Sequence, residues 1–272
     1  NLKIIDYFKQ ENEMSKLSVI GKLINKKFLI IEDLKLIHKK NKFHFKDIYF
    51  NDKNKVESIK KADIKFINKN NLLNSYILSY KNDNYFLKGD LLDISNFLNS
   101  TKKSKYKIFD EKEKKVNFKI KKVYLNKNDY TNNLLADLNF KNNQVTKLNL
   151  NSSFFNGNKL VLKINTNSSG EKITNLYTTY PQPLIKRYKF IKGFEDGILD
   201  FQSIEKNGIS NSILVIDNFK VKEVPALAKI LTLASLQGIA DLLTGEGIRF
   251  TDFDMKFSTK KTLTEIEEIY AI

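Results

Sequence analysis

The sequence predicts a mainly β fold: a long twisted antiparallel sheet curled into a groove, with about three short helices. Three observations predict this fold. Apolar and polar residues alternate with period two along most of the chain, turn residues separate these runs, and only three segments carry helix signals. Because such a sheet has one apolar face, that face must be covered by a second sheet, by helices or by a ligand. Three short helices are few for so many strands, so we expect the sheet to curl around an interior that could accept acyl chains.

The strand predictions rest on short alternating runs. In NKFHFKDIYF, Phe43 and Phe45 alternate with His44 and Lys46. In KLVLKIN, NFKVKEV and FDMKF, the candidate groove-lining positions are Leu160, Leu162, Ile164, Phe219, Val221, Phe253, Met255 and Phe257. The turn signals NDKN, KNDN, NGN, NSSG and KNGISN separate such runs and favour antiparallel hairpins, one of them centred on Gly208.

Three segments are predicted to be helical. Residues 89–100 follow a strand, with Asp93 as a candidate cap. Residues 180–197 begin with two prolines, which suit a helix start, and Gly193 is expected to end the helix. The third helix starts near Pro225, and its apolar stretch runs to Leu243, with Gly245 and Gly247 after the last turn. It holds few charges although the rest of the chain is rich in lysine.

The acidic and lysine-rich run DEKEKK, residues 110–115, is the best candidate for a linker. It divides the chain into residues 1–110, an N-terminal β-rich part of the groove, and residues 111–272. The chain starts at Asn1 without a signal-peptide hydrophobic stretch and stops in an apolar run, so we expect it to be an excerpt of a longer chain.

The formal charge of +16 does not by itself indicate a nucleic-acid partner. Of the 47 basic residues only Arg187 and Arg249 are arginine, the side chain that bidentate contacts to phosphates and bases favour. Residues 201–272 hold 8 basic and 10 acidic residues, whereas residues 1–200 hold 39 and 21. Such a basic body could lie beside anionic lipid headgroups, or its lysines could simply form a soluble surface.

Catalytic groups are scarce. The chain has no cysteine, and its two histidines, His38 and His44, are expected to be exposed strand residues and not metal ligands. Asp252 and Asp254 are expected on the wet face of a strand, and no phosphate-binding or nucleophile motif is present. We therefore expect no enzyme activity, no cofactor and no metal.

The C-terminal part of the chain holds a strand phrase of the form DF.V..AP.LA and a helix phrase resembling LLSLASL.GL.DLL.G.GI.F. The residues that match these phrases are Asp217, Phe219, Pro225, Leu227, Ala228, Leu233, Ala234, Ser235, Leu236, Gly238, Asp241, Leu242, Gly245, Gly247, Ile248 and Phe250. With these phrases the chain resembles the AsmA-like proteins, particularly the YhdP-like branch. LKGDLLDISNFL and GFEDGILDFQS are weaker echoes of the family, the second departing from its glycine pair at Glu195 and Asp196.

The resemblance implies a bridge-like lipid-transfer protein of the periplasm, anchored in the inner membrane through a segment not present here. Its apolar groove would carry phospholipid towards the outer membrane. No catalytic motif comes with the family. The expected partners are phospholipids and the membrane, with no nucleic acid, and the protein partners stay open.

Two alternatives remain. The apolar strand residues could line an open groove or pack against the helices in a closed core. A structural or assembly factor for the outer membrane, which binds protein partners through its sheet edges, is the alternative function. The helical stretch at residues 225–243 is apolar on two sides, which favours burial between layers over a membrane span. We expect it to plug or close the groove through Leu227, Ile230, Leu231, Ala234 and Leu236.

Overall fold

The computed structural model describes residues 3–4, 7–9, 12–24, 27–95, 98, 113–141, 144–186, 192–223 and 247–272. The chain divides into two compact units, residues 1–148 and residues 149–272, and each is described by itself. The sequence placed its division at residues 110 and 111. The strands before and after that position pair with each other, so both lie in the first unit.

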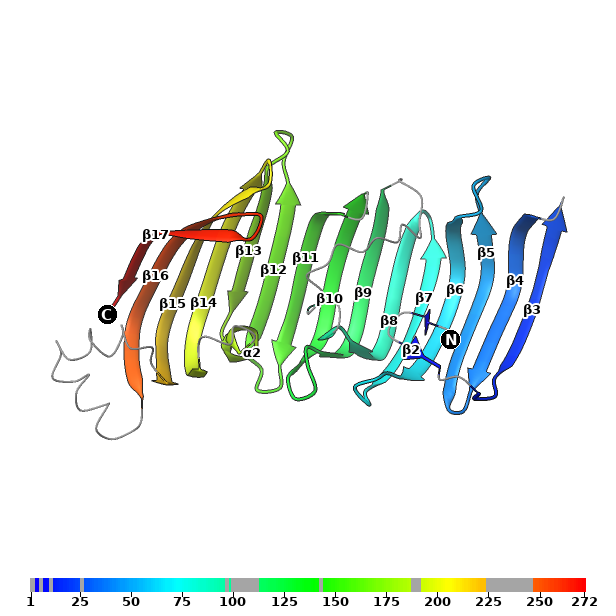
Figure 1. The fold of residues 1–272 in the computed structure, drawn as a ribbon, viewed down its shortest axis with the longest axis horizontal. Coiled ribbons are helices and arrows are strands. Elements are labelled where there is room, and N and C mark those ends of the chain that lie inside the picture. Colours follow the sequence, from blue (N-terminus) through cyan, green and yellow to red (C-terminus); the bar gives the residue numbers. More distant parts are fainter. Residues whose placement is uncertain are drawn as a thin grey trace. The chain divides into compact units, whose positions relative to one another are not determined.

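The first unit is built from a run of sheet strands and a small separate hairpin (Figure 1). Strands β3 to β10 are hydrogen-bonded neighbours in sequence order. All their pairs are antiparallel except β8 with β9, which are parallel. The sheet strands are β3 (Lys16–Ile24), β4 (Lys27–His38), β5 (Asn41–Phe50), β6 (Val56–Ile67), β7 (Leu73–Lys81), β8 (Asn84–Asp93), β9 (Lys114–Tyr124) and β10 (Tyr130–Lys141), and the hairpin is β1 (Lys3–Ile4) with β2 (Tyr7–Phe8).

The second unit continues the same pattern. Its strands β12 to β17 are antiparallel neighbours in sequence order, and β11 (Gln144–Phe154) runs across the division between the units. The order of hydrogen-bonded strands, β3 to β17, is that of one open 15-stranded sheet, which confirms the predicted mainly β class and the long sheet. The strands are β12 (Lys159–Thr166), β13 (Lys172–Thr178), β14 (Lys192–Lys206), β15 (Ile209–Glu223), β16 (Ile248–Lys260) and β17 (Leu263–Ala271).

The predicted turns lie between strands. The hairpin of β14 and β15 closes at the pair Lys206 and Ile209, with Asn207 and Gly208 both at positive φ, the conformation of a type I′ turn. Asn82 and Asp83 play the same part between β7 and β8. Asparagine, aspartate and glycine tolerate this left-handed backbone, which explains why these residues mark the turns in the sequence.

Some long strands change the phase of their alternation at one left-handed residue. In β15 the buried or half-buried apolar positions Leu214 and Ile216 are followed, three residues later, by Phe219. Asn218, with φ 52°, lies between Ile216 and Phe219. Gly197, which has no side chain and has φ 89°, lies at the same level on β14. Since both strands change phase at the same level, the register is kept and the apolar side chains stay on one face.

Two helix predictions fall partly on strands. Residues 89–93 belong to β8 and not to a helix, whereas Ser95 and Leu98 are helical. The predicted cap is present, because the Ser95 amide donates to Asp93 Oδ1 over 2.8 Å. Asp93 Oδ2 accepts from the amide groups of Asn68 and Asn70. Burial alone would raise the pKa of Asp93, but these hydrogen bonds outweigh it and lower that pKa.

The second predicted helix is one short turn, α2 (Gln182–Ile185), with Pro181 and Pro183 at its start as expected. From Lys192 onward the chain is strand β14, so Gly193 does not end a helix. The reason is tertiary. Phe194 lies opposite Val221 on β15 and stacks on Phe219, with ring centroids 5.2 Å apart, which buries this end of the strand.

Candidate functional site

One face of the first unit carries two rows of apolar side chains that cross eight strands. Each residue lies directly opposite the next one on the neighbouring strand. The first row is Leu17, Leu36, Phe43, Ile64, Tyr76, Gly89, Ile120 and Leu134, and the second is Val19, Leu34, Phe45, Ala62, Leu78, Leu87, Phe118 and Ala136. We call these the first and second apolar rows.

The two rows differ in exposure. From β4 to β10 the side chains of the first row are buried, apart from Gly89, which has none. In the second row the larger side chains, such as Phe45, Leu87 and Phe118, stay half-buried, and Val19 on the terminal strand is 44% exposed. The second row therefore offers a band of apolar surface that reaches solvent.

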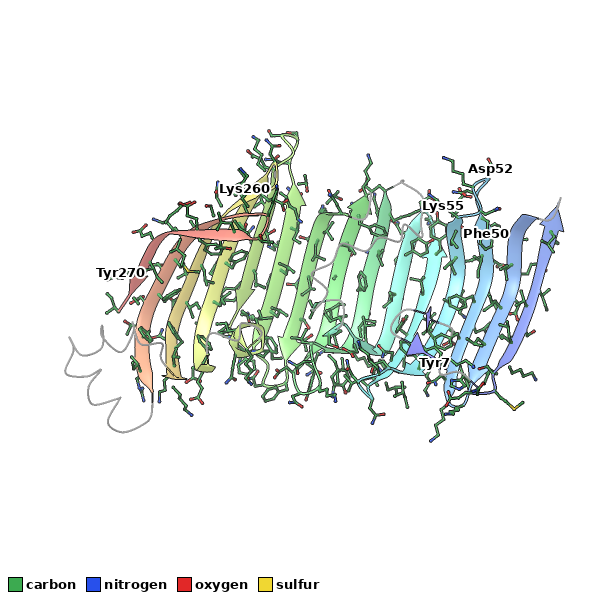
Figure 2. The ribbon with its side chains drawn as sticks, in the orientation of Figure 1. Tyr7, Phe50, Asp52, Lys55, Lys260 and Tyr270 are labelled. Carbon is green, nitrogen blue, oxygen red and sulfur yellow. The ribbon has the colours of Figure 1, made fainter. Side chains whose placement is uncertain are left out.

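The hairpin of β1 and β2 covers part of this face (Figure 2). The ring of Tyr7 lies 4.8 Å from the ring of Phe43 and 5.9 Å from that of Phe66, between centroids. The Tyr7 hydroxyl is hydrogen-bonded to Nδ1 of His38, and burial raises the pKa of Tyr7. Tyr7 thus covers the first apolar row at Phe43 with an aromatic ring while its polar group keeps a partner.

The sequence predicted that both histidines are exposed, and this prediction is wrong. His38 is buried at the end of β4 because it packs under Tyr7, and its Nε2 lies 2.8 Å from Glu13 Oε2 at an angle unsuited to a hydrogen bond. A hydrogen bond from Lys39 lowers the pKa of Glu13. His44 is half-buried, with Nε2 2.6 Å from Asp33 Oδ1. Within the described ranges no three such groups gather as metal ligands would.

The second unit has an equivalent apolar face, and the eight candidate residues all lie on it. Three rows cross from β12 to β16: Leu160, Thr178, Leu199, Ile216 and Phe253, then Leu162, Leu176, Phe201, Leu214 and Met255, then Ile164, Thr174, Ser203, Ser212 and Phe257. The middle row is apolar throughout, and we call it the central row. Phe219 and Val221 continue the face beyond the phase change in β15.

Exposure separates the candidates into two groups. Leu160, Phe219 and Val221 are buried, the last two in a cluster with Ile185 of α2, so their side chains pack within the protein as in a closed core. The other five, Leu162, Ile164, Phe253, Met255 and Phe257, are half-buried. The face is therefore closed near α2 and remains partly open along the central row.

Sequence reasoning missed the middle of the central row. Leu176, Phe201 and Leu214 are half-buried and connect Leu162 on β12 to Met255 on β16. The alternation in GILDFQSI and in NSILVIDNF carried the signal. The same residues form a hairpin signal, and a hairpin signal does not show which of its alternating side chains line the apolar face.

Other predicted positions fall elsewhere. Asp252 and Asp254 are both exposed, as expected for a wet face. The plug-helix candidates Leu227, Ile230, Leu231, Ala234 and Leu236 lie outside the described residues. In the part of the chain that the structure describes, every helix is too short or too polar to cross a membrane.

Comparisons with known proteins give no relative: no protein-family model, no curated protein and no solved structure matches the chain.

Proposed function

We propose that this chain binds phospholipid acyl chains along its apolar sheet face, as a segment of a bridge that transfers phospholipid between the inner and outer membranes. The observation that carries the proposal is the pair of half-buried apolar bands, the second apolar row and the central row. A sheet face with an exposed apolar band needs a ligand or another element to cover it.

The dimensions of the bands suit an acyl chain. Neighbouring strands lie about 4.8 Å apart, so the five strands of the central row span about 19 Å. One leaflet of a bilayer is about 15 Å of hydrocarbon, which is the length that a bound chain would present. Each methylene removed from water contributes about 0.8 kcal/mol, so partial cover of one chain supplies binding energy without any polar contact.

The placement in the periplasm, anchored in the inner membrane by a segment outside this chain, rests on the resemblance to the AsmA-like proteins. Three of the matching residues, Phe219, Ile248 and Phe250, belong to or pack against the core cluster beside α2. Their role in this chain is thus to close the end of the apolar face, which leaves the central row as the binding surface.

Photo-crosslinking tests the proposal with matched positions on one strand. Photoreactive residues replace Phe253 and Phe257 on the apolar face, and Asp254 and Lys256 on the opposite face of β16 serve as controls. We expect phospholipid to be recovered from cells on the first pair and not on the second. Equal recovery from both faces, or none from either, would contradict a lipid-binding face.

The alternative function, an outer-membrane assembly factor that binds proteins through sheet edges, is favoured by the terminal strands. β3 and β17 end the sheet order, and β17 is exposed along its whole length. Leu263 lies opposite Lys260, and Tyr270, labelled in Figure 2, lies opposite Asp254, so both are on the polar side of β17. If the sheet edge binds a protein partner, changing both residues to lysine should abolish that binding. If the apolar face binds lipid, the same change should leave the recovery of crosslinked lipid intact.

A further inference from the structure

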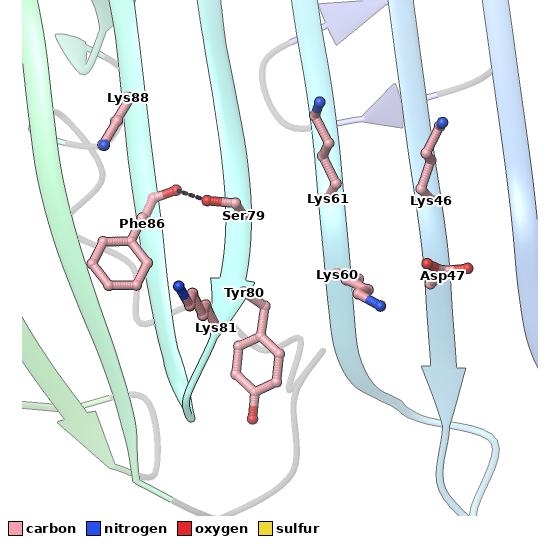
Figure 3. A pocket seen from close by; sticks show the side chains of 9 residues that line it. All are labelled: Lys46, Asp47, Lys60, Lys61, Ser79, Tyr80, Lys81, Phe86 and Lys88. Carbon is pink, nitrogen blue, oxygen red and sulfur yellow. Dashed lines mark hydrogen bonds between the residues drawn. The ribbon is translucent and has the colours of Figure 1, made fainter.

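The polar face of the first unit carries a lysine-lined hollow that the proposed lipid path does not use. Figure 3 shows this hollow, of about 620 Å³, on strands β5 to β8. Its lining is Lys46, Asp47, Lys60, Lys61, Ser79, Tyr80, Lys81, Phe86 and Lys88. We call its five lysines the lysine cluster. They face one carboxylate, that of Asp47, so the hollow is strongly cationic.

The cluster places like charges directly opposite each other. Lys46 on β5 lies opposite Lys61 on β6, and Lys88 on β8 lies opposite Lys119 on β9. Lys42 and Lys65 repeat the pattern two rows away on β5 and β6. Like charges at directly opposite positions destabilise a sheet, so this arrangement costs folding free energy.

The neighbouring carboxylates do not neutralise it. Lys46 has Asp33 as its other cross-strand neighbour, but the Asp33 oxygens lie 2.6 Å from His44 and 3.0 Å from Lys35. Throughout the described ranges the cluster lysines have no ion-pair partner, and all five are exposed. Their ammonium groups are therefore available to an anion from outside the chain.

Lysines elsewhere on the sheet have carboxylate partners. In the second unit Lys172 lies opposite Glu205 and Lys256 opposite Glu268, with Lys206 2.9 Å from Glu171. In the first unit Lys121 lies 2.8 Å from Asp90. The cluster differs from these lysines because its five ammonium groups share one hollow without such partners in the described part of the chain.

We propose that the lysine cluster docks the first unit on the surface of a bilayer that contains anionic phospholipid, by attraction to the headgroup phosphates. Lysine ammonium groups are point charges without the planar fork that fixed phosphate or base geometry favours. An open cluster of such charges suits a surface whose anions can rearrange, and half-buried Phe86, two residues before Lys88 on β8, offers aromatic contact at the headgroup level. Lys46, Lys61 and Lys88 are each adjacent in sequence to a residue of the second apolar row, so these three side chains lie on the other side of the sheet from that row.

Vesicle flotation tests the proposal with two triple variants. Lys46→Gln, Lys61→Gln and Lys88→Gln remove three cluster charges, whereas Lys172→Gln, Lys206→Gln and Lys256→Gln remove three charges with glutamate partners. The protein is mixed with vesicles of phosphatidylcholine containing about a third phosphatidylglycerol, and with pure phosphatidylcholine vesicles. We expect binding only to the anionic vesicles, weakened roughly a hundredfold by the cluster variant and only a few-fold by the control.

Several outcomes would overturn the proposal. Equal losses in the two triple variants would mean that net charge alone drives binding. Equal binding to the neutral vesicles would mean that the apolar face, and not the cluster, holds the membrane. Unchanged vesicle binding by the cluster variant, with loss of binding to an acidic polypeptide or a DNA oligonucleotide, would assign the hollow to that other partner.

A folding control keeps the test independent of misfolding. Because the cluster variant removes like-charge pairs, its urea unfolding midpoint should equal or exceed that of the unmodified protein. Met255→Asp, on the apolar face, should leave vesicle binding unchanged even where it abolishes acyl-chain binding. A failure of the lipid groove and a failure of the docking surface therefore give different results.

Discussion

Phe219 of β15 stacks on Phe250 of β16, with ring centroids 5.0 Å apart and an angle of 12° between the ring planes. Phe194 stacks on the other side of Phe219, so three neighbouring strands share one aromatic column. This column closes the apolar face of the second unit beside α2. The same face continues half-exposed along the central row, so core and candidate binding surface lie next to each other on one sheet.

Replacing Phe219 with alanine should destabilise the second unit by about 3–5 kcal/mol, because the ring is buried and has aromatic neighbours on both sides. Urea unfolding followed by circular dichroism measures the loss. Ile204→Ala, at a half-exposed position on β14, is the control and should change stability by less than about 1 kcal/mol. Similar losses in both variants would show that the column is not a core.

Met255→Asp should abolish acyl-chain binding, because a carboxylate placed in the central row meets no hydrogen-bond donor from a hydrocarbon chain. Ile213→Asp is the matched control, since Ile213 lies opposite Lys256 on the other face of the sheet. Native mass spectrometry of the purified proteins measures bound phospholipid. Retention of lipid by the Met255 variant would argue against the central row as the binding surface.

Asp93→Asn should lower the free energy of unfolding by about 1–3 kcal/mol at neutral pH. The two oxygens of the buried carboxylate accept hydrogen bonds from N–H groups, whereas the NH₂ group of an asparagine would place a second donor against one set of these N–H groups. The pKa of Asp93 is lowered in the folded state. Its stabilisation is therefore present above the unfolded pKa of about 3.9 and is lost as the pH falls through the folded pKa. The difference between the urea midpoints of the two proteins should start to shrink below about pH 4 and should disappear as the pH falls through the folded pKa of Asp93; a gap that stays constant with pH would refute this role.

Gly89→Ala should destabilise the first unit by about 1–3 kcal/mol through overpacking, since a Cβ would lie 2.4 Å from the Ser75 carbonyl oxygen and 2.6 Å from Tyr76 Cβ. Gly157→Ala separates crowding from backbone strain. Gly157 has φ 81° but no atom within 4 Å of a Cβ, so its replacement should cost only about 1 kcal/mol. Thermal unfolding of the two variants compares these costs, and the reverse order of stability would contradict the crowding at Gly89.

The local pattern of the sequence was enough to predict the strands, the hairpin at Gly208 and the apolar face of β12 and β16. Alternation with period two and left-handed turn residues are local properties, so they need no knowledge of neighbouring strands. The cap at Asp93 followed for the same reason. Gly193 misled the prediction because a glycine followed the proline-rich helix start, whereas the pairing of Phe194 with β15 decided for a strand.

The sequence by itself determined that this protein is mainly β and that its strands have one apolar and one polar side. Only the tertiary structure decided which parts of each face are free: it buried Phe219 and Val221 with α2 but left Phe201 and Met255 half-exposed, and it set Lys46 against Lys61 while pairing Lys256 with Glu268. The physical reason is register. Alternation fixes the face on which a side chain lies, but the partner that buries or neutralises it is chosen by strands far away in the sequence.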